Sequence, residues 1–269
     1  MAATGSAVLR GSITMKDFYQ QFYTILAQTT AHAEFCARVF GRDLCQHGFA
    51  DMAQLEKILE VTRIGPGQRA LDLGCGNGLI AEYLSDCSGA HFTGLDYIPT
   101  AIEQARQRTA AKADRLAFQV GDINALDLPD HTFDLIVSID TLYFSDDYAL
   151  TLRQLRQALK PGGQMAIYFA HGRMPWEAKE DFPTETVQPD QNPLGEALKA
   201  AGMPFQTWDF TQDDYRLAQL RKEILAELRP RFEAEGLTFI YENRSGDANG
   251  VSGAVESGQH GRYLYLVRP

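Results

Sequence analysis

One acidic side chain and three glycines with the spacing of a nucleotide site fall between residues 69 and 78, which read R-A-L-D-L-G-C-G-N-G. Asp72 ends an apolar run, and Gly74, Gly76 and Gly78 follow at alternate positions. Glycine permits a sharp turn and a close approach of backbone to a ligand. The helix expected from Leu79 points its N-terminal amides at the same place. The stretch therefore predicts a nucleotide-type site at a strand–turn–helix junction.

Two more acidic residues lie at the ends of the next strands: Asp96 ends the second strand, and Asp122 follows the third. Asp96 can accept hydrogen bonds from the vicinal hydroxyls of a ribose. Asp122 can accept from an adenine amine, with Ile98 or Ile123 packed on the ring. Asp72 suits a ligand ammonium, whereas a carboxylate beside the glycine turn would repel a pyrophosphate. Adenine, ribose and an amino acid together favour S-adenosylmethionine (SAM) over NAD.

Alternating strands and helices position these residues. The apolar runs predict strands at 69–73, 91–96, 116–120, 133–139, 164–169, 205–210 and 262–267. Helices are expected between most of them, which implies an α/β fold with a doubly wound, mostly parallel, seven-stranded Rossmann-like sheet. Ligands of such sheets bind at the carboxyl ends of the strands, where the acids lie.

The flanks of this alternation are less regular. Residues 17–40 are helical in pattern and rich in aromatic side chains, most of which we expect in the core. Residues 171–192 predict a long loop. A strong amphipathic helix is expected at 213–228, and Pro230 should disrupt its continuation. Residues 245–258 are rich in Gly and Ser and favour a loop.

Composition limits the classes of function. The chain has 269 residues and a formal net charge of −10, which disfavours a nucleic acid or an anionic membrane surface as partner. No stretch approaches the roughly 20 apolar residues that span a bilayer, and the start lacks the apolar region of a signal peptide. Four cysteines form no C-x-x-C pair, so neither disulfides nor a metal site is expected. We expect a cytoplasmic protein.

The motifs resemble those of the class I SAM-dependent methyltransferases. L-D-L-G-C-G-N-G is similar to the family's first motif, G-L-D-Y to its ribose acid and V-G-D-I to its adenine motif. F-D-L-I-V-S-I-D-T-L-Y-F resembles the fourth-strand motif, and L-K-P-G-G the turn before the fifth strand. The similar block covers about residues 60–170, with the motifs in the family's order.

The resemblance implies a set of cofactor residues. Asp72, Gly74 and Gly76 would hold the methionine part, and Asp96 the ribose. Tyr97 and Ile98 would flank the adenine, and Asp122 and Ile123 would bind its edge. Asp140 and Tyr143, after the fourth strand, would lie beside the methionine part and the substrate.

The flanks resemble small-molecule methyltransferases of the glycine/sarcosine and phosphoethanolamine type. This resemblance implies a helical lid at 1–50, a core at 51–210, a cap at 211–260 inserted before the last strand, and that strand at 261–269. A lid and a cap favour a small molecule in a closed pocket. The substrate candidates are His47, Phe49, Tyr143, Phe144 and His171.

The catalytic candidates are His47, Tyr143 and His171. Histidine or tyrosine would serve an acceptor that must lose a proton, whereas a neutral amine needs no strong base. N-, O- and C-methylation stay open, with an amine or a natural product preferred as the acceptor. A SAM-binding sensor or partner protein without transferase activity is the alternative. The sequence leaves the oligomeric state open, a homodimer included.

Overall fold

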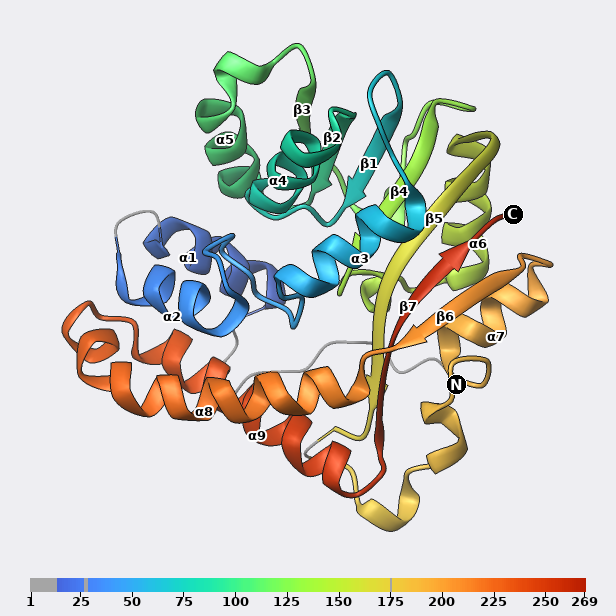
Figure 1. Cartoon of the computed structure of the whole chain (residues 1–269). Coiled ribbons are helices and arrows are strands. Elements are labelled where there is room, and N and C mark those ends of the chain that lie inside the picture. Colours follow the sequence, from blue (N-terminus) through green and yellow to red (C-terminus); the bar gives the residue numbers. More distant parts are fainter. Residues whose placement is uncertain (1–13, 27–28, 175) are drawn as a thin grey trace.

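The computed structural model describes residues 14–26, 29–174 and 176–269. A seven-stranded sheet runs through its centre in the order β3-β2-β1-β4-β5-β7-β6 (Figure 1). The strand β7 pairs antiparallel with β5 and with β6, and the other neighbouring strands of the described sheet pair in parallel. The strands are β1 (Arg69–Leu73), β2 (His91–Asp96), β3 (Leu116–Val120), β4 (Phe133–Ile139), β5 (Leu159–Gly172), β6 (Phe205–Asp209) and β7 (His260–Val267). The predicted α/β, mostly parallel sheet is confirmed.

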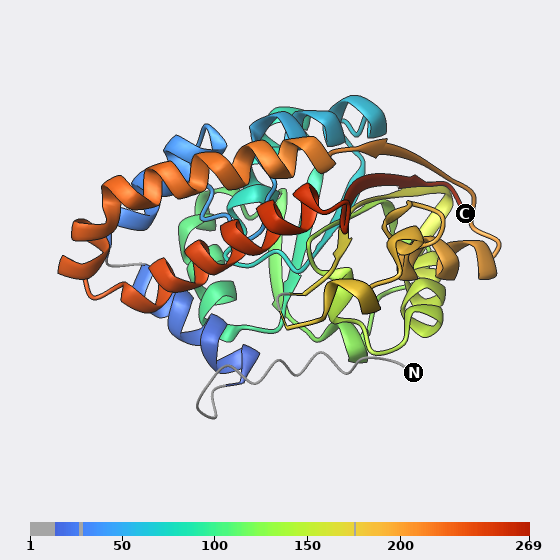
Figure 2. The same ribbon diagram turned by 90° about the horizontal axis from the view of Figure 1, so that it is seen from below.

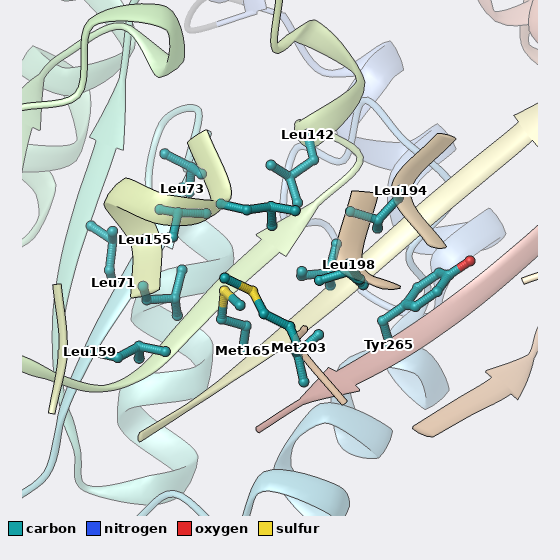
Figure 3. Packing of buried hydrophobic residues seen from close by; sticks show 14 of the residues in the cluster. Leu71, Leu73, Leu142, Leu155, Leu159, Met165, Leu194, Leu198, Met203 and Tyr265 are labelled. Carbon is teal, nitrogen blue, oxygen red and sulfur yellow. The ribbon is translucent and has the colours of Figure 1, made fainter. Parts of the chain in front are cut away.

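Helices cover both faces of the sheet. They are α3 (Met52–Thr62), α4 (Leu79–Ser88), α5 (Pro99–Arg108), α6 (Tyr148–Ala158) and α7 (Pro193–Ala200). Leucines of α6 and α7, such as Leu155 and Leu198, pack with Leu71 and Met165 on one face (Figure 3). Apolar side chains of α3, α4 and α5 pack on the other face. The sheet is therefore doubly wound, and the packed side chains on its two faces hold the carboxyl ends of the strands in place.

Four helices outside these layers surround the carboxyl edge of the sheet. They are α1 (Met15–Leu26), α2 (Ala31–Phe40), α8 (Thr211–Ala234) and α9 (Thr238–Glu256). Figure 2, which views the molecule from below, shows α8 and α9 side by side across this edge, with α1 and α2 beside them. Their apolar side chains share one buried cluster, with Phe22, Phe35, Leu225 and Ile240 among its members. The predicted lid and cap regions thus form one helical layer, and the first thirteen residues of the predicted lid lie outside the described part.

Two local predictions in the cap are wrong. Pro230 lies inside α8, which continues to Ala234 because Leu228 and Phe232 are buried on either side of it. Tertiary packing therefore outweighs the hydrogen bond that proline cannot donate. Most of the predicted loop at 245–258 is helical, since α9 extends to Glu256. Its buried residues recur at a spacing of four, from Ile240 through Arg244 and Ala248 to Ser252.

Two further boundaries differ from prediction. The expected helix at 17–40 is two helices, α1 and α2. The loop predicted at 171–192 contains the end of β5 and two short 3-10 helices, Lys179–Asp181 and Thr184–Val187. Within the described residues, no helix is both long enough and apolar enough to cross a membrane.

Candidate functional site

A cavity of about 540 Å³ lies at the carboxyl ends of β1, β2 and β4. Its walls come from α1, the loop at 44–50 (the lid loop), the turn after β1, the ends of β2 and β3, and the segment after β4. This volume lies in the range of small-molecule sites. The position agrees with the rule that doubly wound sheets bind ligands at their carboxyl edge.

The turn after β1 requires glycine at two positions. Gly74 and Gly76 have φ of +80° and +54°, in the left-handed region that glycine favours. A Cβ on Gly74 would collide with the Thr141 side chain, and one on Gly76 with the Tyr23 hydroxyl. The Gly74 N–H donates to the Leu95 carbonyl at 2.8 Å, which fixes the turn against β2.

Two carboxylates lie beside this turn. Asp96 Oδ2 accepts from the Gly76 N–H at 2.8 Å, and Oδ1 accepts from the Ile98 N–H at 2.9 Å. Asp72 is 3% exposed, and its buried Oδ2 has no hydrogen-bond partner among the described residues. Burial, together with the negative charge of Asp96, raises the pKa of Asp72 to about 7. An ammonium group of a ligand would satisfy this oxygen and restore the ordinary ionisation of Asp72.

All nine residues predicted to bind the cofactor line this one cavity. They are Asp72, Gly74, Gly76, Asp96, Tyr97, Ile98, Asp122, Ile123 and Asp140. The side chain of Ile98 is almost fully buried, which gives the adenine region an apolar wall. The donor set therefore fits SAM, because it offers an acid to an ammonium, an acid to a ribose and apolar groups to an adenine ring.

Asp140 lines the cavity but has structural partners of its own. Its carboxylate forms a bidentate ion pair with Arg262, with Nη2 and Oδ2 3.0 Å apart. Oδ2 also accepts from the Phe49 N–H at 3.1 Å. Arg262 is 1% exposed and also contacts Asp214 and Gln54. Asp140 thus joins the lid loop to the last strand, a contact that the sequence did not indicate.

The residues predicted for the acceptor divide into two groups. His47, Tyr143 and Phe144 line the cavity. Phe49 does not, because its ring packs beneath the Arg221 guanidinium at 3.6 Å. His171 does not line it either: its Nε2 lies 3.1 Å from Thr186 Oγ1, and its ring packs against Phe182. The structure therefore separates His171 from the other catalytic candidates.

Tyr19 and Tyr23 line the cavity although most aromatic residues of this segment were expected in the core. The Tyr19 hydroxyl lies 3.3 Å from His47 Nδ1. The neighbouring Phe18 and Phe22 are buried. In the sequence, the hydroxyl group was the only signal that separated the two cavity-lining tyrosines from these phenylalanines. In the described ranges, no three His, Cys, Asp or Glu side chains gather as metal ligands.

Comparisons with known proteins agree with this geometry. Residues 64–219 match the family model described as a methyltransferase domain. Phosphoethanolamine N-methyltransferase 1 of Zea mays is 30% identical over 210 residues, which are 76% of this chain and 40% of that protein. The corresponding protein of Arabidopsis thaliana is 30% identical over 228 residues, 82% of this chain and 44% of that protein. This chain thus spans less than half the length of either relative.

A solved structure shows that the whole fold is shared. Mycolic acid cyclopropane synthase CmaA1, complexed with S-adenosylhomocysteine (SAH) and CTAB, superposes with a TM-score of 0.70 at 16% identity. The match covers 92% of this chain and 98% of that one, so it includes the helices around the cavity as well as the sheet.

Proposed function

Because this chain belongs to the class I SAM-dependent methyltransferases, we propose that it transfers the methyl group of SAM to a small molecule in the cavity. One observation carries the proposal. The buried Asp72 oxygen, which has no hydrogen-bond partner within the described part of the chain, shares a 540 Å³ cavity with the glycine turn and Asp96, where a zwitterionic nucleoside fits. SAM would supply an electrophilic methyl carbon.

The chain's own residues bind, orient and exclude water. Asp72 would hold the ammonium, and the Asp96 carboxylate, fixed by two backbone N–H groups, would hold the ribose. The helix α1 and the loop at 44–50 cover the cavity, and α2, α8 and α9 pack with α1 in one buried cluster behind them. Holding donor and acceptor in line in a dry site accounts for much of the acceleration expected of such an enzyme.

We place the acceptor against Tyr19, His47, Tyr143 and Phe144, which line the cavity from the lid and from the segment after β4. Neither His171 nor Phe49 lines the cavity, so we do not place these two residues in contact with the acceptor. His47 is a poor proton acceptor, because burial and the charges of Arg244 and Arg221 hold its pKa well below the ordinary value. The contact between His47 and Tyr19 instead suits a role in which His47 orients the Tyr19 hydroxyl.

Calorimetric titration with SAM tests the cofactor assignment. Asp96→Ala should weaken SAM binding by about 1–3 kcal/mol, because it removes charge-assisted hydrogen bonds to the ribose. Asp114→Ala, which changes an exposed acid ahead of β3 and outside the cavity, should leave SAM affinity unchanged. Equal SAM affinity in folded Asp96→Ala would refute the assignment.

Turnover distinguishes an enzyme from a binding protein. The wild-type protein should transfer labelled methyl groups from SAM into a pool of small metabolites. SAM binding without any transfer across a broad pool would instead support a sensor or a partner protein.

A further inference from the structure

Four rings form a continuous wall at the acceptor end of the cavity. This aromatic wall consists of Tyr19, His47, Tyr143 and Phe144, all of which line the cavity. Ring centroids are 4.8 Å apart for Tyr19 and His47, 4.7 Å for Tyr143 and Phe144, and 6.5 Å for Tyr19 and Phe144. Tyr143 keeps 42% of its surface accessible, so its side chain is available to a ligand.

The charges around the cavity are unsuited to a phosphate. Lys16 is the one basic side chain among the described lining residues, and its Nζ lies 5.9 Å from the Tyr97 ring centroid, on the cofactor side. The lining carboxylates are Asp72, Asp96, Asp122, Asp140 and Asp146. Arg262 is paired with Asp140 and Asp214, whose charges raise its pKa although burial lowers it. A phosphate would therefore meet more negative than positive charge.

Two further arginines near the lid do not change this balance at the cavity surface. Arg221 and Arg244 are fully buried and do not line the cavity. Arg221 donates to the Gly48 carbonyl, and Arg244 Nη1 donates to the His47 carbonyl at 3.2 Å. These hydrogen bonds hold both guanidinium charges behind the lid loop, away from the cavity surface.

The wall also lacks a group suited to remove a proton from an alcohol. Burial raises the pKa of Tyr19, and the charges of Tyr97 and Asp247 add to that effect. Although 42% of the Tyr143 surface is accessible, loss of solvent around its hydroxyl raises the pKa of that group, and the charges of Asp140 and Asp247 raise it further. Both phenols thus stay protonated, and His47 stays neutral. A neutral amine needs none of these groups as a base, because its lone pair is already available.

On the basis of the proposed function, we propose that the acceptor is an amine that carries no phosphate group, with its nitrogen against the rings of Tyr19 and Tyr143. The amine reacts as its free base, after releasing its proton to solvent, and its lone pair forms the new N–C bond while the C–S bond breaks and its electron pair stays on sulfur. The positive charge thereby passes from sulfur to nitrogen, and the methylated ammonium later releases any proton it carries to solvent. Aromatic faces stabilise a cation at that position.

A matched pair of ligands tests this proposal directly. Choline and phosphocholine carry the same quaternary ammonium and differ by a phosphate. We expect choline to bind the SAH-saturated protein, and phosphocholine to bind about tenfold or more weakly, measured by calorimetry at one ionic strength. Tighter binding of phosphocholine, or no binding of either ligand, would overturn the proposal.

Two variants of one residue test the role of the wall. Tyr143→Leu should weaken choline binding about fivefold to tenfold, because it removes an aromatic face, whereas Tyr143→Phe should retain most of the affinity. Both variants should keep the circular dichroism spectrum of the wild type, which shows that they are folded. Equal choline affinity in the Leu and Phe variants would remove Tyr143 from the ammonium site.

Turnover separates this inference from the proposed function. Ethanolamine and phosphoethanolamine, with a phenol as a third acceptor, are offered with labelled SAM. Preference for ethanolamine supports the inference. Preference for phosphoethanolamine or the phenol would overturn it and leave the methyltransferase function intact. Failure to bind SAM or SAH would instead count against the proposed function itself.

Discussion

At the scale of single residues, the acids at the strand ends could be predicted because each follows a recognisable apolar strand. Asp72, Asp96 and Asp122 are brought together by the parallel sheet alone. The environments of Asp140 and His171 could not be predicted in this way. Their partners Arg262 and Thr186 lie far along the chain or in an irregular segment, and no spacing rule connects them.

Asp72 should make SAM binding depend on pH. Its pKa of about 7 means that acidification protonates the carboxyl group and removes its attraction for the ammonium of SAM. SAM affinity should therefore fall as pH decreases from 7.5 to 5.5, by up to about tenfold per unit below pH 7. Calorimetric titrations across this range measure the slope.

The control for this prediction is Asp72→Asn, which cannot ionise. It should bind SAM weakly, with a flat profile over the same range. A wild-type profile as flat as that of the variant would contradict the role of Asp72. In the ligand-free protein the same shift acts on folding, where the stability contributed by the protonated form is lost as pH rises through about 7.

At the scale of elements, the lid loop is held by the cap and the last strand. Arg221 of α8 and Arg244 of α9 bind backbone carbonyls of this loop, and Asp140 accepts from the Phe49 N–H. Gly48 packs so closely on the Asp140 carboxylate that a Cβ would overlap it. The shape of the acceptor end thus depends on segments about 170 to 220 residues away in sequence.

Arg262 should position the acceptor without binding it. Arg262→Lys keeps the charge but loses the planar bidentate contact with Asp140, so the lid loop should lose part of its anchor. We expect KM for the acceptor to rise more than the Kd for SAM, because Asp140 lies at the lid side of the cavity. Steady-state kinetics and SAM titration measure the two effects.

Removal of the Arg262 charge should affect stability as well. Arg262→Met leaves buried carboxylates without their partner and should cost about 3–5 kcal/mol in denaturant unfolding. Arg229→Met, which removes an exposed arginine paired with Glu233, should change stability little. Similar losses in the two variants would contradict a special role for Arg262.

The Gly/Ser-rich segment shows why one element type was mispredicted. Its small residues have low helix propensity, but α9 packs along α8, and Ala248 and Ser252 are buried at the spacing of a helix. Gly246 lies in this helix with open space where a Cβ would extend. Gly246→Ala should therefore raise the free energy of unfolding by roughly 0.5–1 kcal/mol.

Gly202→Ala is the control for Gly246→Ala, and its expected effect on stability has the opposite sign. Open space also surrounds it, but its φ is +63°. Gly202→Ala should therefore lower stability, because alanine is strained in the left-handed region. Thermal or urea unfolding measures both changes, and a destabilised Gly246→Ala variant would contradict a helix at this position.

At the scale of the whole molecule, the cavity joins elements of the sheet and the helical layer. A ligand there should stabilise the folded chain as a unit. SAH at a hundred times its Kd should raise the free energy of unfolding by about 2.7 kcal/mol. The melting temperature should then rise by roughly 5–10 °C in a thermal scan. A midpoint that does not change at saturating SAH would contradict a site formed by the folded chain.

The antiparallel pairing of β6 with β7 has a consequence for how this protein can change over evolution. Asp209 pairs with Tyr263, and the Phe210 N–H donates to the Arg262 carbonyl at 2.8 Å. The cap therefore leaves the sheet and returns to it at neighbouring points. A segment inserted between two neighbouring points of a sheet can be lengthened, shortened or exchanged while the sheet keeps its register. Changes in the cap can thus alter how Arg221 and Arg244 anchor the lid loop, and with it the acceptor end of the cavity, while the glycine turn and its acids are inherited unchanged.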